Sequence, residues 1–237
     1  EIFSFILDNN ISSHFHFEIG AHLLDEETLA LLGTVPEGMF QFEIGVQSTV
    51  SETLLNIERS VSLEKLAKNV RYLRQKTNIH LHLDLIAGLP GENYGQFLQS
   101  LDWVAELSPH HLQIELVKLL PGAPLRGQAD GLSLFYDPHP PYTVLETTEL
   151  RYSELERLRG IGRLIDLLWN SEKFKLLLPA LAKVAGSFSA AFEQLELFWV
   201  EQGYFEQPQS LRGVFSGLYQ YVQGCFSGTQ KETLREA

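Results

Sequence analysis

The sequence predicts an α/β fold, in which a partial (β/α) barrel of parallel strands is followed by a mostly α-helical C-terminal domain. Two observations predict it. Between residues 14 and 120, segments in which polar and apolar residues alternate are separated by segments with apolar residues at helical spacing. From about residue 146 onward, Leu, Phe, Trp and Tyr recur at helical spacing. Strands separated by crossover helices form a parallel sheet with right-handed connections.

Four strands are predicted, each with one polar face: His14–Ile19, Gln41–Val46, Ile79–Ala87 and His111–Leu119. In the third, His80, His82 and Asp84 alternate with leucines. Parallel strands buried on both faces normally carry near-continuous apolar runs, and a closed eight-stranded barrel fills its interior with apolar side chains. The polar face favours a wide or incomplete barrel that holds a polar ligand. A sheet with one face toward solvent is the alternative.

Helices are predicted between these strands. Asp25 is a suitable N-cap for Glu26–Leu32. Apolar residues recur at helical spacing in the two later connections, at Leu63, Leu66, Val70 and Leu73 and at Phe97, Leu101 and Val104. The opening Glu1–Asn10 is interpreted as the end of an amphipathic helix with Ile2, Phe5 and Ile6 on one side. Because the only methionine is Met39, we expect a fragment excised from a longer protein.

The expected domain organisation has three parts. Residues 1–126 form the partial barrel, residues 127–145 a linker rich in Gly, Pro and Asp, and residues 146–237 the helical C-terminal domain.

Composition excludes several classes of protein. The formal charge of −12 argues against nucleic-acid binding, which needs Lys and Arg patches. No apolar run is long enough for a membrane helix, and the start has no signal-peptide pattern. The single cysteine, Cys225, excludes an intramolecular disulfide and a multi-cysteine metal site, and we expect it to be a small buried side chain. Together these features predict a cytoplasmic location without membrane or nucleic-acid partners.

Three motifs end predicted strands with Gly or Pro: Phe42–Ser48, Leu83–Glu92 and Leu119–Leu125. Ligands of α/β sheets bind at the C-terminal ends of the strands. Gly45, Gly88 and Gly91 would allow close approach or positive φ, and Pro90 stiffens its turn. The motifs therefore predict one ligand-binding edge.

Taken in order, these motifs resemble the later strands of radical S-adenosylmethionine (radical SAM) enzymes. The matching patterns are Glu43-x-Gly45-x-Gln47-Ser48, Leu54-x-x-Ile57-x-Arg59, Asp84-x-Ile86-x-Gly88-x-Pro90-Gly91-Glu92 and Leu120-Pro121-Gly122. The Phe17-Glu18-Ile19 and Phe42–Ser48 segments resemble the subgroup in which a cobalamin-binding domain precedes the barrel and an uncharacterised helical domain follows it. The Tyr152–Leu155 and Trp169–Ser171 segments resemble that helical domain.

The resemblance implies roles for individual residues. It places Gln47 and Ser48 near the SAM ribose, and it pairs Arg59 with the SAM carboxylate, a bidentate task suited to guanidinium. The full set of implied cofactor-binding residues is Glu43, Gln47, Ser48, Arg59, Ile86, Gly88, Leu119 and Leu120, of which the last four would contact the adenine. The implied substrate-facing residues are Glu18, Asp84, Glu115, His16 and His82. Each carboxylate could equally be a structural hydrogen-bond partner.

The chain departs from the family at one decisive point. Radical SAM chemistry needs a CxxxCxxC loop whose three thiolates hold a [4Fe–4S] cluster, and the chain has no such loop. By the family's order the four strands would be the last four of six. The resemblance therefore implies a parent enzyme that cleaves SAM to a 5′-deoxyadenosyl radical, as a cobalamin-dependent methyltransferase or an oxidative cyclase-like enzyme. We expect this fragment to be inactive without the upstream barrel and cobalamin-binding region.

Two other interpretations stay open. His14, His16, His80, His82 and nearby carboxylates could ligate Zn or Mn in a non-radical enzyme. Alternatively the chain is a non-catalytic interaction module. An exposed edge of a parallel sheet pairs readily with another chain, so a homodimer through His14–Ile19 is expected.

Overall fold

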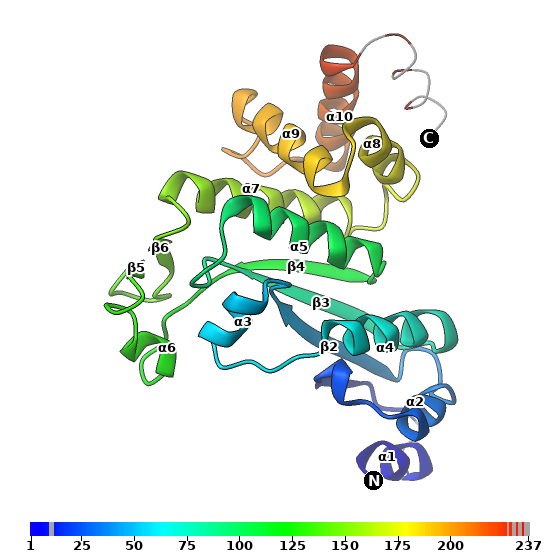
Figure 1. Ribbon diagram of the computed structural model, residues 1–237. Helices are drawn as coiled ribbons and strands as arrows, with labels where there is room; N and C mark the ends of the chain where they lie inside the picture. The colour runs from blue at the N-terminus through cyan, green and yellow to red at the C-terminus, as the bar shows by residue number, and fades with distance from the viewer. Residues whose placement is uncertain (10–11, 227, 229–230, 232–233, 235–237) are drawn as a thin grey trace. The chain divides into compact units, whose positions relative to one another are not determined.

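The computed structural model describes residues 1–9, 12–226, 228, 231 and 234 (Figure 1). The chain divides into two compact units, residues 1–155 and 156–237. The predicted division at residues 126 and 146 stays a prediction.

The first unit contains a four-stranded parallel sheet in the order β1-β2-β3-β4. Its strands are β1 (Phe15–Glu18), β2 (Phe40–Gln47), β3 (His80–Ala87) and β4 (His111–Leu116). The helices before and between them are α1 (Ile2–Asn9), the 3₁₀ turn η1 (Ala21–Leu23), α2 (Glu26–Leu32), α3 (Ser51–Asn56), α4 (Leu63–Lys76) and α5 (Tyr94–Glu106). The predicted α/β fold class is confirmed.

The strand register aligns the polar residues into rows across the sheet. Glu18 is paired with Glu43, Glu43 with His82, and His82 with His111. One row further along, Gly45 is paired with Asp84 and Asp84 with Gln113. A register shift between Gly45 and Gln47 then pairs Gln47 with Leu85. The predicted polar residues therefore share one face.

The opposite face of the sheet is the apolar core. Phe42, Ile44, Leu83 and Leu85 are fully buried there. In α4 and α5, which connect successive strands (Figure 1), the predicted apolar positions from Leu66 to Leu73 and from Phe97 to Val104 are also buried. The Asp25 carboxylate accepts a hydrogen bond from the Thr28 amide at 2.8 Å, which confirms the predicted cap of α2.

Helix α1 packs through a different side chain than expected. Ile2 and Phe5 are 69% and 66% exposed. Phe3 instead has its ring centroid 5.2 Å from that of Phe17 and 5.7 Å from that of Phe42. The predicted helix is therefore present, and the ring that packs is Phe3, because periodicity alone does not say which stripe meets an aromatic cluster.

The segment after β4 folds back toward that strand. Strand β4 ends at Leu116 rather than at the predicted Leu119, and α6 (Pro124–Gly127) follows. Two short antiparallel strands, β5 (Phe135–Tyr136) and β6 (Val144–Glu146), lie within or beside the expected linker. The Arg126 guanidinium lies 5.2 Å from the Tyr136 ring and 4.9 Å from the Tyr142 ring, an arrangement that favours cation–π attraction.

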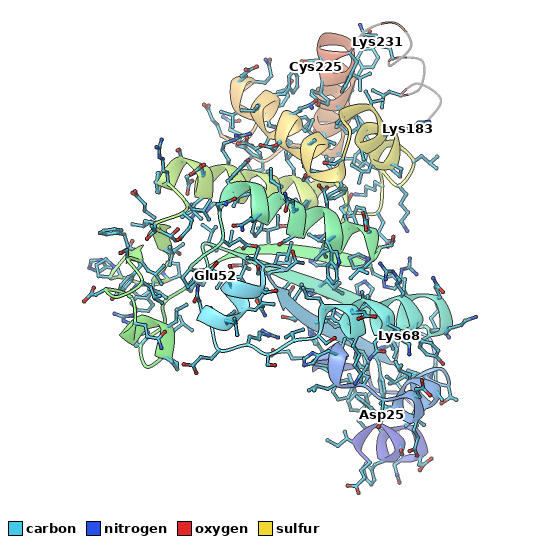
Figure 2. The ribbon with its side chains drawn as sticks, viewed as in Figure 1. Asp25, Glu52, Lys68, Lys183, Cys225 and Lys231 are labelled. Atoms are coloured by element: carbon cyan, nitrogen blue, oxygen red, sulfur yellow. The ribbon has the colours of Figure 1, made fainter. Side chains whose placement is uncertain are left out.

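The second unit is helical, as predicted. Helix α7 (Tyr152–Leu168) begins in the first unit, and α8 (Leu177–Ala185), α9 (Phe188–Glu201) and α10 (Leu211–Cys225) follow. Phe192, Trp199 and Tyr221 are its largest fully buried side chains. Cys225, at the end of α10 (Figure 2), is exposed, so the expectation of a buried cysteine was wrong. None of the helices in the described residues is long and apolar enough to span a bilayer.

Candidate ligand site on the polar face of the sheet

A hollow of about 280 Å³ lies on the polar face of the sheet, toward the ends of β1 and β2. Its lining residues come from three strands and from the loop after α3: Glu18, Ile19, Glu43, Gly45, Gln47, Arg59 and Asp84. Five of the predicted site residues therefore meet at one place. A larger depression of about 820 Å³ lies over α2 and α4, where none of the predicted site residues is found.

Gly45 is the floor of this hollow. The Arg59 guanidinium donates a hydrogen bond from Nη2 to the Gly45 carbonyl oxygen at 3.0 Å. A Cβ on Gly45 would collide with the Gln47 side-chain amide and would lie 3.3 Å from Arg59 Nη2. Gln47 adopts a positive φ of 70°, which is uncommon for a residue with a side chain. The register shift at this point lets β2 bend and presents Gln47 to the hollow.

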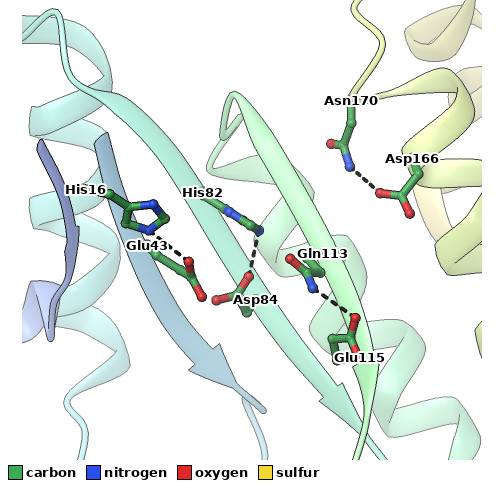
Figure 3. Close-up of polar contacts among 8 residues, drawn as sticks. All are labelled: His16, Glu43, His82, Asp84, Gln113, Glu115, Asp166 and Asn170. Atoms are coloured by element: carbon green, nitrogen blue, oxygen red, sulfur yellow. Dashed lines mark hydrogen bonds and ion pairs between the residues drawn. The ribbon is translucent and has the colours of Figure 1, made fainter. Parts of the chain in front are cut away.

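Two histidine–carboxylate contacts and one amide–carboxylate hydrogen bond lie on the polar face (Figure 3). His16 Nε2 lies 2.9 Å from Glu43 Oε2, joining β1 to β2. His82 Nε2 lies 2.9 Å from Asp84 Oδ1 within β3, although the angles at this contact are poor for a hydrogen bond. The His82 ring also meets the His111 ring edge-on at 4.1 Å between centroids.

Several groups here have shifted pKa values. Burial by itself lowers the pKa of His82, but Asp84, Glu43 and Gln113 outweigh it, so the pKa is raised. Burial lowers the pKa of Arg59. Hydrogen bonding from Lys118 Nζ to Oε2, at 2.8 Å, lowers the pKa of Glu115.

Glu115 lies on the same face but outside the hollow. Besides the contact with Lys118, its Oε1 accepts a hydrogen bond from Gln113 Nε2 at 3.0 Å. Both oxygens therefore already have partners within β4 and the residues just after it.

Ser48 points away from the hollow. It is fully buried, and its hydroxyl donates to Glu92 Oε1 at 2.7 Å and accepts from the Val50 amide at 3.0 Å. The implied contact of Ser48 with a ribose stays a prediction, and the structure shows this hydroxyl with other partners. Strict strand alternation would already have put Gln47 and Ser48 on opposite faces.

The four residues implied for the adenine are spread over two strand ends. Ile86 is partly exposed on the polar face, and Gly88 follows it with a φ of 90°. Leu119 is fully buried, and its carbonyl accepts from Arg126 Nη1 at 2.9 Å, while Leu120 is 52% exposed. None of the four lines the hollow.

The sequence analysis did not identify Asn56, Glu92 and Ser100, three residues whose hydrogen bonds hold the loops next to the hollow. Glu92 and Ser100 form a buried network with Ser48. Asn56 donates from Nδ2 to the Pro90 carbonyl at 3.1 Å, and Gly91 leaves room for it, since a Cβ there would lie 2.7 Å from that nitrogen. The signal that could have revealed them is the Pro90-Gly91-Glu92 turn, in which an acidic residue directly follows a strand and loop of buried apolar residues.

The predicted histidines do not gather into a cluster of metal ligands. Among the described residues, no group of three or more His, Cys, Asp or Glu side chains is arranged to hold a metal ion. His16 and His82 each contact a single carboxylate instead.

Residues 132–237 match a protein family whose description is "Protein of unknown function (DUF4080)". Among curated proteins, the chain is 28% identical over 115 residues to the heme chaperone HemW of Buchnera aphidicola subsp. Schizaphis graminum (strain Sg). It is 33% identical over 91 residues to the oxygen-independent coproporphyrinogen-III oxidase-like protein HemZ of Bacillus subtilis (strain 168). These matches cover 48% and 38% of this chain but only 30% and 18% of the relatives.

Among solved structures, the chain is similar to coproporphyrinogen III oxidase (HemN) from Escherichia coli, described as a radical SAM enzyme. The TM-score is 0.43 at 18% identity, over 68% of this chain and 42% of that chain. It is also similar to the radical SAM methyltransferase TsrM from Kitasatospora setae, with cobalamin and a [4Fe–4S] cluster bound. Here the TM-score is 0.44 at 19% identity, over 60% and 30% of the two chains.

Proposed function

We propose that this chain is the SAM-binding part of a radical SAM enzyme. The observation that carries the proposal is the convergence of Glu43, Gln47 and Arg59 on one hollow beside Gly45. The ordered motifs that resemble radical SAM enzymes support it, as does the sequence similarity to HemW and to the oxygen-independent coproporphyrinogen-III oxidase-like protein HemZ.

The residues of the hollow fit SAM. Arg59 lines the hollow and uses only Nη2 to bind the Gly45 carbonyl, so its other guanidinium nitrogens suit the carboxylate of an amino acid. The Gln47 amide can donate to and accept from ribose hydroxyls. Glu18, Glu43 and Asp84 are acidic groups that suit the positive charges of SAM. Because Gly45 has no side chain, the Gln47 amide and the Arg59 guanidinium can lie directly against the strand at this point.

The iron–sulfur cluster does not fit this chain. A [4Fe–4S] cluster needs three thiolates, and the sequence has one cysteine, at the end of α10. We infer that its ligands lie elsewhere in the parent protein and that this chain alone is inactive. In that parent protein, one electron from the reduced cluster would cleave SAM into methionine and a 5′-deoxyadenosyl radical, which would take a hydrogen atom from an unidentified substrate.

The finer assignment is a cobalamin-containing radical SAM enzyme that acts as a methyltransferase or as an oxidative cyclase-like enzyme. It is supported by the Phe17–Ile19 and Phe42–Ser48 motifs and by the helical region after the barrel, which lies within the match to the family of unknown function. The proposed partner is the upstream barrel and cobalamin-binding region of the same protein. In the isolated chain, a second copy would take the β1 edge instead. A cytoplasmic location is inferred from the cysteine content and charge.

The test uses the full-length gene product, purified without oxygen. We expect bound iron and sulfide, and we expect 5′-deoxyadenosine when SAM and a reductant are added. The Arg59→Lys protein should form less of it, while Arg74→Lys should behave as wild type, since Arg74 donates to the Ser108 carbonyl and does not line the hollow. A protein that holds its cluster but releases no 5′-deoxyadenosine would refute the proposal.

A further inference from the structure

A fully buried carboxyl group lies behind the hollow, where the turn after β3 enters α5. Glu92 Oε1 accepts hydrogen bonds from the hydroxyls of Ser48 at 2.7 Å and Ser100 at 3.1 Å. These serines come from the end of β2 and from α5, so one oxygen atom joins three segments. Oε2 is also buried and has no hydrogen-bond partner among the described residues.

The surroundings favour the neutral form of this group. A charged carboxylate buried with only two hydroxyl donors is costly, whereas a neutral carboxylic acid leaves at most one unpaired O–H. Burial raises the pKa of Glu92 to about 7, and the hydroxyls of Ser48 and Ser100 only partly oppose the shift. Titratable side chains on the helices that flank it in the sequence include the exposed Glu52 of α3 (Figure 2) and the partly exposed Tyr94 and Asp102 of α5.

The two serines in turn hold the backbone that follows the hollow. Ser48 Oγ accepts from the Val50 amide at 3.0 Å, and Ser100 Oγ accepts from the Thr49 amide at 3.1 Å. The Thr49 hydroxyl lies 2.7 Å from Ser100 Oγ as well. Gln47, which lines the hollow at a positive φ, directly precedes this segment. A backbone conformation of this kind persists only where its surroundings enforce it.

We propose that Glu92 is a positioning residue, which as a neutral acid holds residues 47–50 through Ser48 and Ser100 and so presents Gln47 to the ligand in the hollow. Ionisation makes local opening easier, because opening returns the charge to water. The contact between Gln47 and SAM rests on the proposed function. The role of Glu92 in holding residues 47–50 is independent of it.

The decisive experiment measures hydrogen exchange of the Thr49 and Val50 amides in the full-length protein at pH 6 and pH 8. After correction for the intrinsic effect of pH on exchange, we expect the protection of both amides to fall about tenfold, because pH 8 lies roughly one unit above the Glu92 pKa. The Glu92→Gln protein, which mimics the neutral acid, should keep its protection. The Leu66 amide, which donates to the Ser62 carbonyl in α4, serves as the reference.

Either of two results would overturn the proposal. One is wild-type protection of Thr49 and Val50 that is equal at both pH values. The other is loss of that protection in Glu92→Gln while the Leu66 amide stays protected. Glu92→Ala tests the network itself and should lose protection at both pH values.

SAM affinity separately tests whether the segment held by Glu92 controls ligand binding. We expect wild type to bind SAM about tenfold more weakly at pH 8 than at pH 6, and Glu92→Gln to remove this difference. A protein that binds no SAM at either pH contradicts the proposed function, while the exchange data still decide the role of Glu92. Binding that is independent of pH, together with pH-dependent exchange, would show that the segment does not control the ligand and would overturn that part of the proposal.

Discussion

Arg59 donates from Nη2 to the Gly45 carbonyl oxygen at 3.0 Å, and it does so at the one point of β2 where the chain has no side chain. The contact ties the loop after α3 to the strand and brings a cation to a face rich in carboxylates. Strand and loop therefore depend on each other for the shape of the hollow.

Gly45→Ala should damage both the hollow and the fold. The added methyl group would collide with the Gln47 side chain, so we expect about 1–3 kcal/mol lower stability and clearly weaker SAM binding. Chemical denaturation and equilibrium dialysis would measure the two effects. Gly95→Ala is the matched control, because its Cβ would only reach Asn93 Oδ1 at 3.6 Å. Equal stability and equal SAM binding of the two variants would contradict the close packing around Gly45.

Arg59→Lys should weaken SAM binding about tenfold with little loss of stability, because an ammonium group cannot bind the Gly45 carbonyl and a carboxylate with the same fork geometry. Isothermal titration of the full-length protein would measure the affinity. If this variant bound SAM as tightly as wild type, Arg59 would not contact SAM.

Stability should depend on pH through Glu92. Its pKa of about 7 in the folded protein lies above the ordinary carboxyl value, so its favourable contribution is complete below that ordinary value and is lost as the pH rises through 7. Between pH 5 and pH 8.5, wild type should therefore lose about 2 kcal/mol of unfolding free energy relative to Glu92→Gln. Urea denaturation at each pH would show it, and parallel curves for the two proteins would speak against it.

The edge of β1 should support self-association. The amides of Phe15 and Ile19 donate toward β2, so by strand alternation the His16 amide points outward. We expect a dimer of the isolated chain in sedimentation and a monomer for His16→Pro, which lacks that amide. His16→Ala controls for the lost contact with Glu43 and should remain a dimer. A wild-type monomer would end this prediction.

The second unit has its own tight glycine. A Cβ on Gly160 would lie 2.8 Å from Glu196 Cγ, whose buried carboxylate contacts Arg157 Nε at 3.4 Å. We expect Gly160→Ala to lower stability by about 1–3 kcal/mol. Gly224→Ala in α10, with nothing in the described part of the chain within 4 Å of its Cβ, should be neutral or stabilise by up to about 1 kcal/mol. Thermal unfolding of both variants would separate them.

The sequence by itself determined the parts that rest on local periodicity. Alternation in steps of two predicted four strands with one polar face, and all four are present because a strand's side chains point to opposite faces whatever its neighbours are. Helical spacing identified the buried residues of α4 and α5, and the cap at Asp25 lies within residues 25–28.

Only the tertiary structure decided which side chains meet. Glu43 contacts His16 from 27 positions away because two parallel strands align them, and no spacing in the sequence encodes that register. The same holds for Ser48, whose partner Glu92 lies 44 residues away and draws its hydroxyl into the core. The motif grouped Gln47 with Ser48, but the pleat and the register shift leave Gln47 facing the hollow and put Ser48 behind it.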